Sequence, residues 1–249
     1  RVLVVNPGST STKLGIFEGE GFTHREVLRH PAGGMSASSP VPEQLAYLSG
    51  LASRWFRDRG DSCDAVVAMG GLFRPLEGGT YLVNSKMLAD AQAAARGSHA
   101  SNLGCLIADA LARELGCPAF VVDPVSVDEF DPVARYSGHP MIERSSLSHA
   151  LNIHAAARRA ARDLGIPFGT SSFVVAHLGG GISVAPVRGG RIVDVNDAAS
   201  DGPFSPERSG GMPLQPFIGL CLSGNYSEKE LRAMVMGAGG LVAYLGTNN

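Results

Sequence analysis

Apolar residues at the start of the chain fall into short runs separated by turns. The runs predict three strands of a meander, at residues 2–6, 13–18 and about 22–29. A Pro-, Gly- and Ser-rich segment at 31–41 then predicts a loop. From Pro42 to Arg59 the apolar residues instead recur near the helical period, which predicts a helix.

Strands and helices alternate after this point. The pattern predicts buried strands at 65–69 and 119–122 and helices at 85–96 and 102–115. Gly116 and Pro118 end the last of these helices. Alternation of this kind is typical of an α/β protein.

The second half of the chain repeats part of this plan. It predicts a long Ala- and Arg-bearing helix at 146–164, strands at 172–177, 181–187 and 191–195, and a helix at 227–236. We expect the long helix to bridge two domains, at 1–150 and 151–249. The elements after it do not complete a second domain equal to the first.

Composition narrows the class of protein. With 249 residues, 44% hydrophobic and 18% charged, the chain is typical of a soluble globular protein of one large or two modest domains. A net charge of -2 favours neither nucleic acid nor an anionic membrane as a partner. No apolar stretch has the length of a membrane span, and no signal segment precedes the first strand. The four scattered cysteines lack metal-ligand spacing and fit a reducing, cytoplasmic location.

The turn between the first two predicted strands carries candidate phosphate ligands. Its sequence, Asn-Pro-Gly-Ser-Thr-Ser-Thr-Lys over residues 6–13, can aim backbone N–H groups, hydroxyls and a Lys at one point. It is not a Walker A loop, because Thr12 stands where Gly should precede Lys13 and a strand pattern follows. The alternative is an ordinary Ser/Thr-rich hairpin turn.

A second hairpin with the same plan spans residues 175–190. In this copy His177 aligns with Asn6, and Gly179 with Gly8. The cluster Gly179, Gly180 and Gly181 lacks the third glycine of a dinucleotide fingerprint and precedes a strand, so we reject a Rossmann site. The repeat favours a duplicated fold with a nucleotide held between its halves.

Three further polar residues stand at strand ends or in loops. Asp123 ends a buried strand, and we expect Pro124 to hold its backbone extended. Its carboxylate would hold magnesium through water or orient a nucleophile, or else cap a turn or helix. His99 lies in a small-residue loop, where Ser101 or Asn102 is a natural N-cap.

Arg208 lies in a Gly- and Pro-rich loop at 202–211, which is suited to presenting one guanidinium. Arginine binds phosphoryl or carboxylate oxygens in a bidentate manner and keeps its charge. The alternative is a surface Arg paired with Glu207. His149 and His154, on the long helix, fit packing or solvated positions better than catalytic ones.

The chain resembles the butyrate kinases, a branch of the acetate kinase family in the actin and sugar-kinase superfamily. The matching stretches are residues 6–13, 78–84, 99–104, 122–125, 177–183, 202–210 and 239–248. The resemblance implies two ribonuclease-H-like domains around a cleft, with the second incomplete in this chain. It also implies homo-oligomers and the phosphorylation of a short-chain carboxylic acid such as butyrate by ATP with Mg²⁺.

By motif, the resemblance implies roles for individual residues. Asn6, Ser9, Thr10, Ser11 and Lys13 resemble a first phosphate loop, and His177 with Gly179, Gly180 and Gly181 a second. Asp123 resembles the carboxylate that organises magnesium, Arg208 the arginine that grips the transferred phosphoryl group, and His99 and Asn102 its neighbours on the substrate side. The implied mechanism is direct in-line transfer to the substrate carboxylate.

The chain departs from the family pattern at one substrate-side position. The family usually has Gly-Arg-Gly-Gly where residues 68–71 read Ala-Met-Gly-Gly, so Met69 replaces an arginine. Arg74 follows, but on an extended path it would approach from a different place. The alternative function is therefore a catalytically impaired relative that binds phosphate, nucleotide or a partner without turnover.

Overall fold

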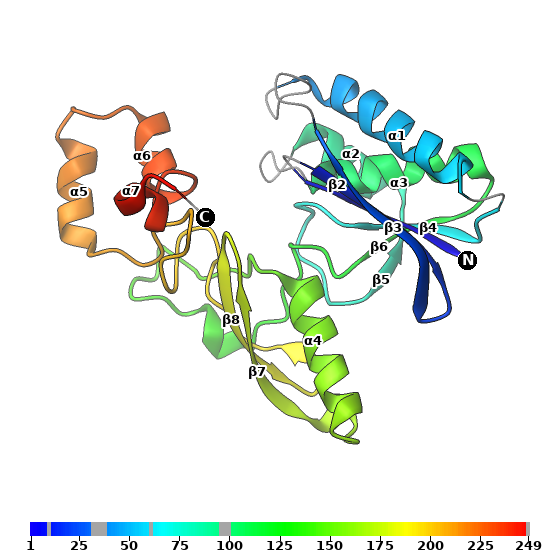
Figure 1. The fold of residues 1–249 in the computed structure, drawn as a ribbon. Coiled ribbons are helices and arrows are strands. Elements are labelled where there is room, and N and C mark those ends of the chain that lie inside the picture. Colours follow the sequence, from blue (N-terminus) through cyan, green and yellow to red (C-terminus); the bar gives the residue numbers. More distant parts are fainter. Residues whose placement is uncertain (9–10, 31–38, 60–61, 95–100, 248–249) are drawn as a thin grey trace. The chain divides into compact units, whose positions relative to one another are not determined.

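The computed structural model describes residues 1–8, 11–30, 39–59, 62–94 and 101–247. The chain folds as two compact units, Arg1–Ser126 and Val127–Asn249. Figure 1 shows both units in the colours of the sequence. This division by contacts lies upstream of the predicted domain boundary between residues 150 and 151, which stays a prediction.

The first unit is built on a six-stranded sheet with the strand order β3-β2-β1-β4-β6-β5. The first three strands form an antiparallel meander, β4 and β6 run parallel to β1, and β5 runs antiparallel to β6. The strands are β1 (Val2–Pro7), β2 (Ser11–Glu18), β3 (Gly21–Arg29), β4 (Ala65–Met69), β5 (Thr80–Leu82) and β6 (Ala119–Val122). This arrangement places the carboxyl ends of β1, β4 and β6 at one edge of the sheet.

Three helices belong to this unit: α1 (Val41–Arg57), α2 (Ser85–Ala93) and α3 (Asn102–Leu115). Apolar side chains of α1 and α3 share one core with alternate residues of the strands. On β1 these are Leu3 and Val5, which are fully buried, while Val4 and Asn6 face the other way. The hydrophobic burial therefore fixes the register of the hairpin, and with it the face on which its polar residues lie.

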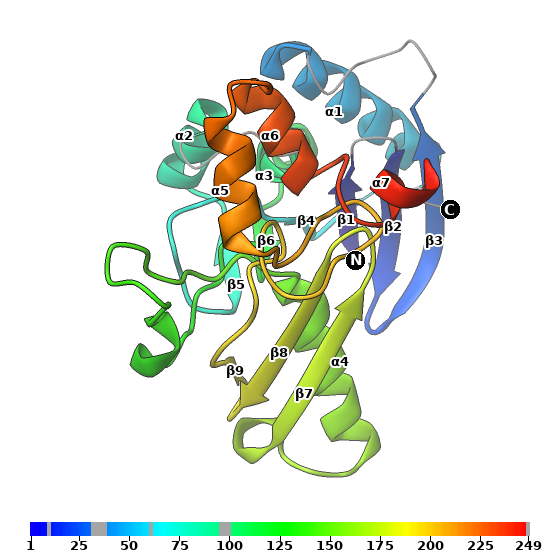
Figure 2. The same ribbon diagram turned by 90° about the vertical axis from the view of Figure 1, so that its left-hand side faces the viewer.

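The second unit contains a three-stranded antiparallel sheet, β7-β8-β9, with α4 packed against it (Figures 1 and 2). Its elements are α4 (Ala150–Asp163), β7 (Ser172–Leu178), β8 (Ile182–Arg188), β9 (Arg191–Ile192), α5 (Leu214–Leu222), α6 (Glu228–Val235), α7 (Leu241–Leu245) and the 3-10 turns η1 (Pro132–Arg135) and η2 (Phe168–Thr170). Ile153, Ala157, Ala185 and Val187 form the centre of its core.

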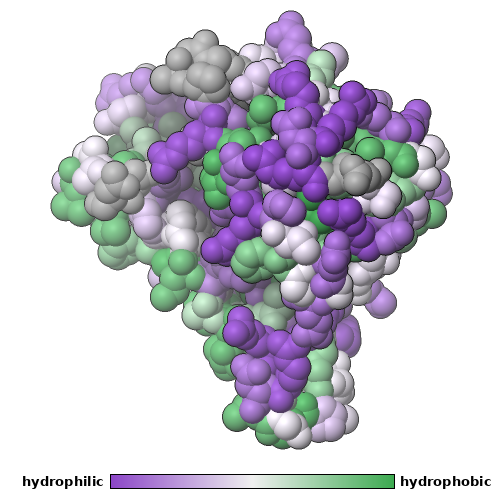
Figure 3. Space-filling model, turned by 45° about the vertical axis from the view of Figure 1, so that its right-hand side comes forward, coloured by the Kyte–Doolittle hydropathy of each residue, from purple (hydrophilic) through white to green (hydrophobic). Residues whose placement is uncertain are grey.

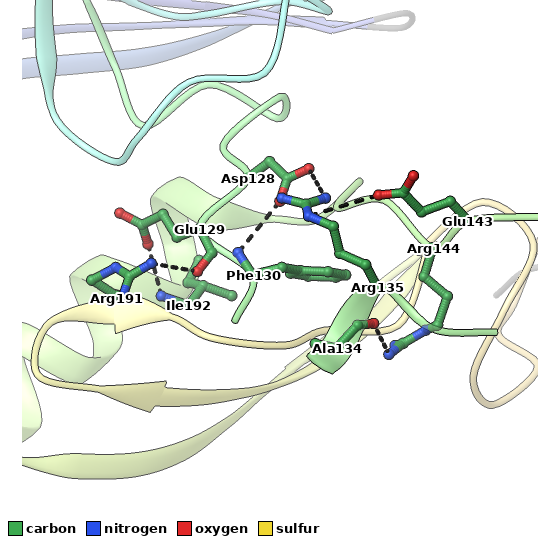
Figure 4. Close-up of polar contacts among 9 residues, drawn as sticks. All are labelled: Asp128, Glu129, Phe130, Ala134, Arg135, Glu143, Arg144, Arg191 and Ile192. Atoms are coloured by element: carbon green, nitrogen blue, oxygen red, sulfur yellow. Dashed lines mark hydrogen bonds and ion pairs between the residues drawn. The ribbon is translucent and has the colours of Figure 1, made fainter. Parts of the chain in front are cut away.

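The segment before α4 belongs to this second unit because its polar groups bind there (Figure 4). The Glu129 carboxylate accepts a hydrogen bond from the Ile192 backbone N–H at 2.7 Å, and Arg191 donates to the Glu129 carbonyl at 2.9 Å. Within the segment, Arg135 binds both carboxylate oxygens of Asp128. Buried Val127 and Phe130 join the same core, which explains why the contact boundary precedes the long helix.

Most predicted elements are confirmed, with local differences. The long helix begins at Ala150, not at residue 146, and the predicted strand at 191–195 is limited to Arg191–Ile192. The strand β5 and the helices α5 and α7 were not predicted. Most of the predicted loop at 31–41 lies outside the described residues.

The surface of the described residues is mixed. On the face shown in Figure 3, hydrophilic residues cover more of the surface than hydrophobic ones. Every helix in the described ranges is too short or too polar to span a bilayer.

Candidate functional site

The first hairpin gathers polar side chains on one face next to its turn. Asn6 on β1 pairs with Lys13 on β2, so the two side chains project from the same face, and Ser11 joins them two residues away. The backbone N–H of Gly8 donates to the Ser11 carbonyl at 2.9 Å and closes the turn. Ser9 and Thr10 lie outside the described residues. The hairpin thus presents an amide, a hydroxyl and an ammonium group together.

Asp123 follows β6 at the same sheet edge as Asn6 and Met69. The register pairs Val5 with Ala68 and Met69 with Val122, so these three residues end neighbouring parallel strands. Ligands of open α/β sheets bind outside such carboxyl ends. The sheet therefore brings Asn6 and Asp123 to one edge of the first unit.

The backbone of Asp123 is not extended, contrary to the expectation from Pro124. Its φ is 37°, in the left-handed region that non-glycine residues rarely adopt. Gly79 holds this conformation, because its N–H donates to Asp123 Oδ1 at 2.7 Å and its carbonyl accepts from Asp123 N–H at 2.9 Å. Asp123 is 1% exposed. Strain at a buried carboxylate is typical of functional sites.

Asn102 is buried and supports the loop after β4. Its Oδ1 accepts a hydrogen bond from the Leu72 N–H at 2.8 Å. A Cβ on Gly71 would lie 2.4 Å from this oxygen, so only glycine fits there. Ser101 is the N-cap residue of α3 but makes no side-chain capping bond. His99 lies outside the described residues.

Arg74 does not substitute for the arginine that Met69 replaces. Its guanidinium is exposed and forms an ion pair with Asp90 at 3.4 Å. Met69 ends β4, and its carbonyl lies against Gly104, where an added Cβ would approach it to 2.3 Å.

The second hairpin presents a glycine turn with an arginine packed on it. The N–H of Gly179 donates to the Gly181 carbonyl at 3.1 Å and closes the turn between β7 and β8. A Cβ at Gly181 would lie 2.1 Å from Arg208 Nη1 and 2.5 Å from its Cζ. The Arg208 guanidinium therefore occupies the space that a side chain at position 181 would fill.

The loop that carries Arg208 is fastened to the hairpin. Ser205 is buried and donates from Oγ to the Gly180 carbonyl at 2.6 Å, while its N–H donates to the Arg208 carbonyl at 2.9 Å. The Arg208 guanidinium donates to the Ala198 carbonyl. Burial lowers the pKa of Arg208, and the charges of Glu207 and Asp197 oppose that shift. Arg208 is thus a half-buried, positioned side chain, not the surface residue of the alternative interpretation.

His177, at the end of β7, lies beside the same turn. A Cβ at Gly179 would be 3.0 Å from His177 Nε2, so this nitrogen faces the turn. The other nitrogen, Nδ1, lies 2.6 Å from the Asn152 amide nitrogen, and the ring stacks on His149 with centroids 3.8 Å apart. Burial lowers the pKa of His177, and the Arg208 charge adds to that shift. Both effects favour the neutral form of the imidazole.

The residues around His177 are those that the sequence interpretation missed. It assigned His149 to packing or solvent and did not name Asn152. It included Ser183 in the matching stretch 177–183 but gave it no role. Their spacing carries a signal, because His149 and Asn152 are three residues apart and can share a helix face.

The described residues contain no group of three or more His, Cys, Asp or Glu side chains able to hold a metal ion by themselves. Asp123 fits a different kind of metal site. A nucleotide-bound Mg²⁺ keeps several waters and takes only one or two carboxylates from the protein. A single fixed carboxylate at a sheet edge meets that requirement.

The chain is similar over its full length to curated butyrate kinases. It is 49% identical over 252 residues to a probable butyrate kinase from Listeria innocua. It is 45% identical over 253 residues to butyrate kinase 2 from Clostridium acetobutylicum. Each comparison covers 100% of this chain and 71% of the relative. No protein-family model matches the chain.

Solved structures show the fold. An acetate kinase from Porphyromonas gingivalis matches with a TM-score of 0.76 at 16% identity, over 100% of this chain and 70% of that chain. A propionate kinase from Francisella tularensis matches with a TM-score of 0.71 at 17% identity, over 100% and 71%. The chain therefore has the actin-like ATPase fold of two ribonuclease-H-like domains, and the coverage agrees with an incomplete second domain. Because it is nearly half identical along its whole length to butyrate kinases, the chain belongs to the butyrate kinase family.

Proposed function

We propose that the protein is an ATP-dependent carboxylate kinase of the butyrate kinase type. It would transfer the γ-phosphoryl group of ATP to butyrate or a branched analogue and release an acyl phosphate. The observation that carries the proposal is the Arg208 guanidinium, held half-buried against Gly181 beside His177. A fixed arginine of this kind is what a transferring phosphoryl group requires.

The first hairpin supplies the other proposed phosphate contacts. Asn6, Ser11 and Lys13 lie on one face of it, and the proposal includes Ser9 and Thr10 from the same turn. Hydroxyl, amide and backbone N–H donors with one ammonium suit the oxygens of a nucleotide polyphosphate. His99 and Asn102 are proposed for the side of the acid substrate. The proposal also includes a cytoplasmic location and a homo-oligomeric assembly.

The chemistry is a direct in-line displacement. A carboxylate oxygen of the acid forms a bond to the γ-phosphorus, and the bond from that phosphorus to the ADP oxygen breaks. A carboxylate is already a nucleophile at pH 7, so no strong general base is needed. Arg208 and the Nε2–H of His177 stabilise negative charge on the phosphoryl oxygens. Asp123 would hold Mg²⁺, which neutralises phosphate charge when bound. Catalysis is then mainly positioning and charge stabilisation.

Acyl phosphate formation tests the proposal directly. The protein, expressed from its complete open reading frame, is incubated with ATP, Mg²⁺ and hydroxylamine together with butyrate, isobutyrate, propionate or acetate. We expect an acyl hydroxamate with butyrate or isobutyrate. The absence of hydroxamate with all four acids would overturn the kinase proposal.

Met69 favours a second candidate, a catalytically impaired family member. Met69 stands at the sheet edge with Asn6 and Asp123 and cannot bind a carboxylate as an arginine would. Under this alternative the protein binds ATP or phosphate without turnover. Recovery of hydroxamate formation by Met69→Arg in an otherwise inactive protein would support it.

A further inference from the structure

Two residues, Asn152 and His149, contact the imidazole of His177, and a third, Ser183, contacts His149. Asn152 and His149 come from the start of α4 and its N-cap, and Ser183 comes from β8. Each makes a contact with a defined geometry. Together they determine where the His177 ring points and which nitrogen carries its proton.

We propose that Asn152, with His149, is a positioning residue that fixes His177 as the neutral Nε2–H tautomer aimed at the glycine turn. The inference rests on the proposed function for its role in phosphate binding, but its physical content concerns this one ring.

Asn152 sets the tautomer. Its amide nitrogen lies 2.6 Å from His177 Nδ1. With the amide nitrogen toward the ring, Asn152 donates and Nδ1 accepts with its lone pair, which places the single proton of the neutral ring on Nε2. Nδ1 therefore accepts a hydrogen bond from Asn152, and Nε2–H remains available as a donor to a ligand.

His149 sets the plane of the ring. The two imidazoles stack with centroids 3.8 Å apart and planes at 10°. His149 is itself anchored, because its Nδ1 lies 2.9 Å from Ser183 Oγ. Ser183 is fully buried and lies directly opposite His177 in the β7–β8 register. The residue that holds His149 therefore belongs to the same hairpin as His177.

These contacts turn Nε2 toward the turn that Arg208 covers. Nε2 is the atom closest to the Cβ position of Gly179, at 3.0 Å, and Arg208 occupies the Cβ position of Gly181. A second positive charge beside Arg208 would be repelled, whereas a neutral N–H adds a donor at no such cost. The arrangement suits an anion such as a phosphoryl group, with one charged and one neutral donor.

Side-chain ¹⁵N NMR on the full chain tests the tautomer without any substrate. His177 resonances are identified from their loss in His177→Gln. We expect the wild type at pH 7.5 to show a protonated Nε2 and an unprotonated Nδ1. In Asn152→Asp the carboxylate accepts from Nδ1–H instead, so we expect the protonated nitrogen to exchange and the pKa of His177 to rise by about one unit.

A matched control separates position from charge. Ala155→Asp introduces the same charge at an exposed position on the next turn of α4, and it should leave the His177 tautomer as in the wild type. His149→Phe keeps a flat ring for stacking, whereas His149→Ala removes it and should give an average of both tautomers. Since Asn152 is exposed, Asn152→Asp is not expected to unfold the protein.

The outcomes are decisive for the inference. A wild-type His177 protonated at Nδ1, or an Asn152→Asp variant that keeps its proton on Nε2, would overturn it. Inorganic phosphate titrations of the same samples provide the link to function, with about tenfold weaker binding expected in Asn152→Asp. A confirmed tautomer in a protein that makes no acyl phosphate would count against the proposed function alone.

Discussion

The two glycine-turn hairpins share a plan but obtain their binding groups differently. In β1–β2 the polar groups are local, since Asn6, Ser11 and Lys13 lie within a single turn and its flanking strands. In β7–β8 the hairpin contributes His177 and the glycines, while Arg208 arrives from a later loop and Asn152 from an earlier helix. The first hairpin can therefore be recognised from a short sequence, and the second only from the fold.

Burial separates the two hairpins as well. Leu3, Val5 and Ile16 of the first are fully buried beneath helices. In the second, Ala185 and Val187 are buried on one face, but Val174 and Leu178 on the other are 77% and 74% exposed in the described part of the chain. The second hairpin is held in addition by polar contacts with a later loop, such as the hydrogen bond from Ser205 Oγ to the Gly180 carbonyl.

The largest expected effect is the loss of Arg208. Arg208→Ala should lower kcat for acyl phosphate formation about 10³-fold, because a fixed guanidinium stabilises charge that develops in the transition state. Circular dichroism should show a folded protein. Arg232→Ala removes an exposed arginine from an ion pair with Glu228 and should leave kcat unchanged. Turnover near the wild-type value in Arg208→Ala would remove this residue from the site.

Adding a single methyl group at Gly181 should lower kcat almost as much as the loss of Arg208. Gly181→Ala places a Cβ where Arg208 lies, with 2.1 Å to Nη1, so the guanidinium must move. We expect kcat to fall about 10²-fold, because a displacement of a positioned group by about 1 Å can have an effect of that size. Gly138→Ala is the control, as nothing lies within 4 Å of its Cβ position. Equal kcat values for both variants would show that Arg208 does not act from its observed position.

The first hairpin should respond in KM more than in kcat. Lys13→Ala removes an exposed ammonium from the face shared with Asn6, and we expect KM for ATP to rise about tenfold. Lys86→Ala removes an equally exposed lysine from α2 and should leave KM unchanged. A fall in kcat as large as that of Arg208→Ala would contradict the distinction drawn between the two hairpins.

The sequence predicts elements well where local signals mark their ends. The helix at 102–115 and the strand at 119–122 match α3 and β6, because Gly116 adopts a left-handed C-cap between them. The helix α5 was missed because Pro216 and Gly219 lie inside it and no polar face gives it a period. Local signals thus locate most of the fold but fail where a helix contains residues that usually interrupt helices.

The candidate site shows a different limit, set by contacts between residues far apart in the sequence. The motif places Asp123 at a strand end, but its left-handed backbone depends on Gly79, which is far away in the sequence. The glycines at 179–181 are visible in the sequence, but the side chain that fills the space at Gly181 is not. Positions that depend on distant partners cannot be derived from spacing alone.

The smallest expected effect concerns the proton on His177. Burial and then Arg208 lower the pKa of His177, so the folded protein binds this proton less readily than the unfolded chain. The stability that this group contributes is complete above the ordinary His pKa of about 6.5 and is lost as pH falls through that value toward the lower folded-state pKa. Between about pH 7 and about pH 5.5, we expect the Tm of the wild type to fall more than that of His177→Gln. Lys13→Gln, which alters the first hairpin and leaves His177 in place, should keep the wild-type slope. Parallel Tm profiles for the wild type and His177→Gln would mean that the second hairpin does not depress the pKa of His177, and the difference between the two hairpins would then be one of geometry alone.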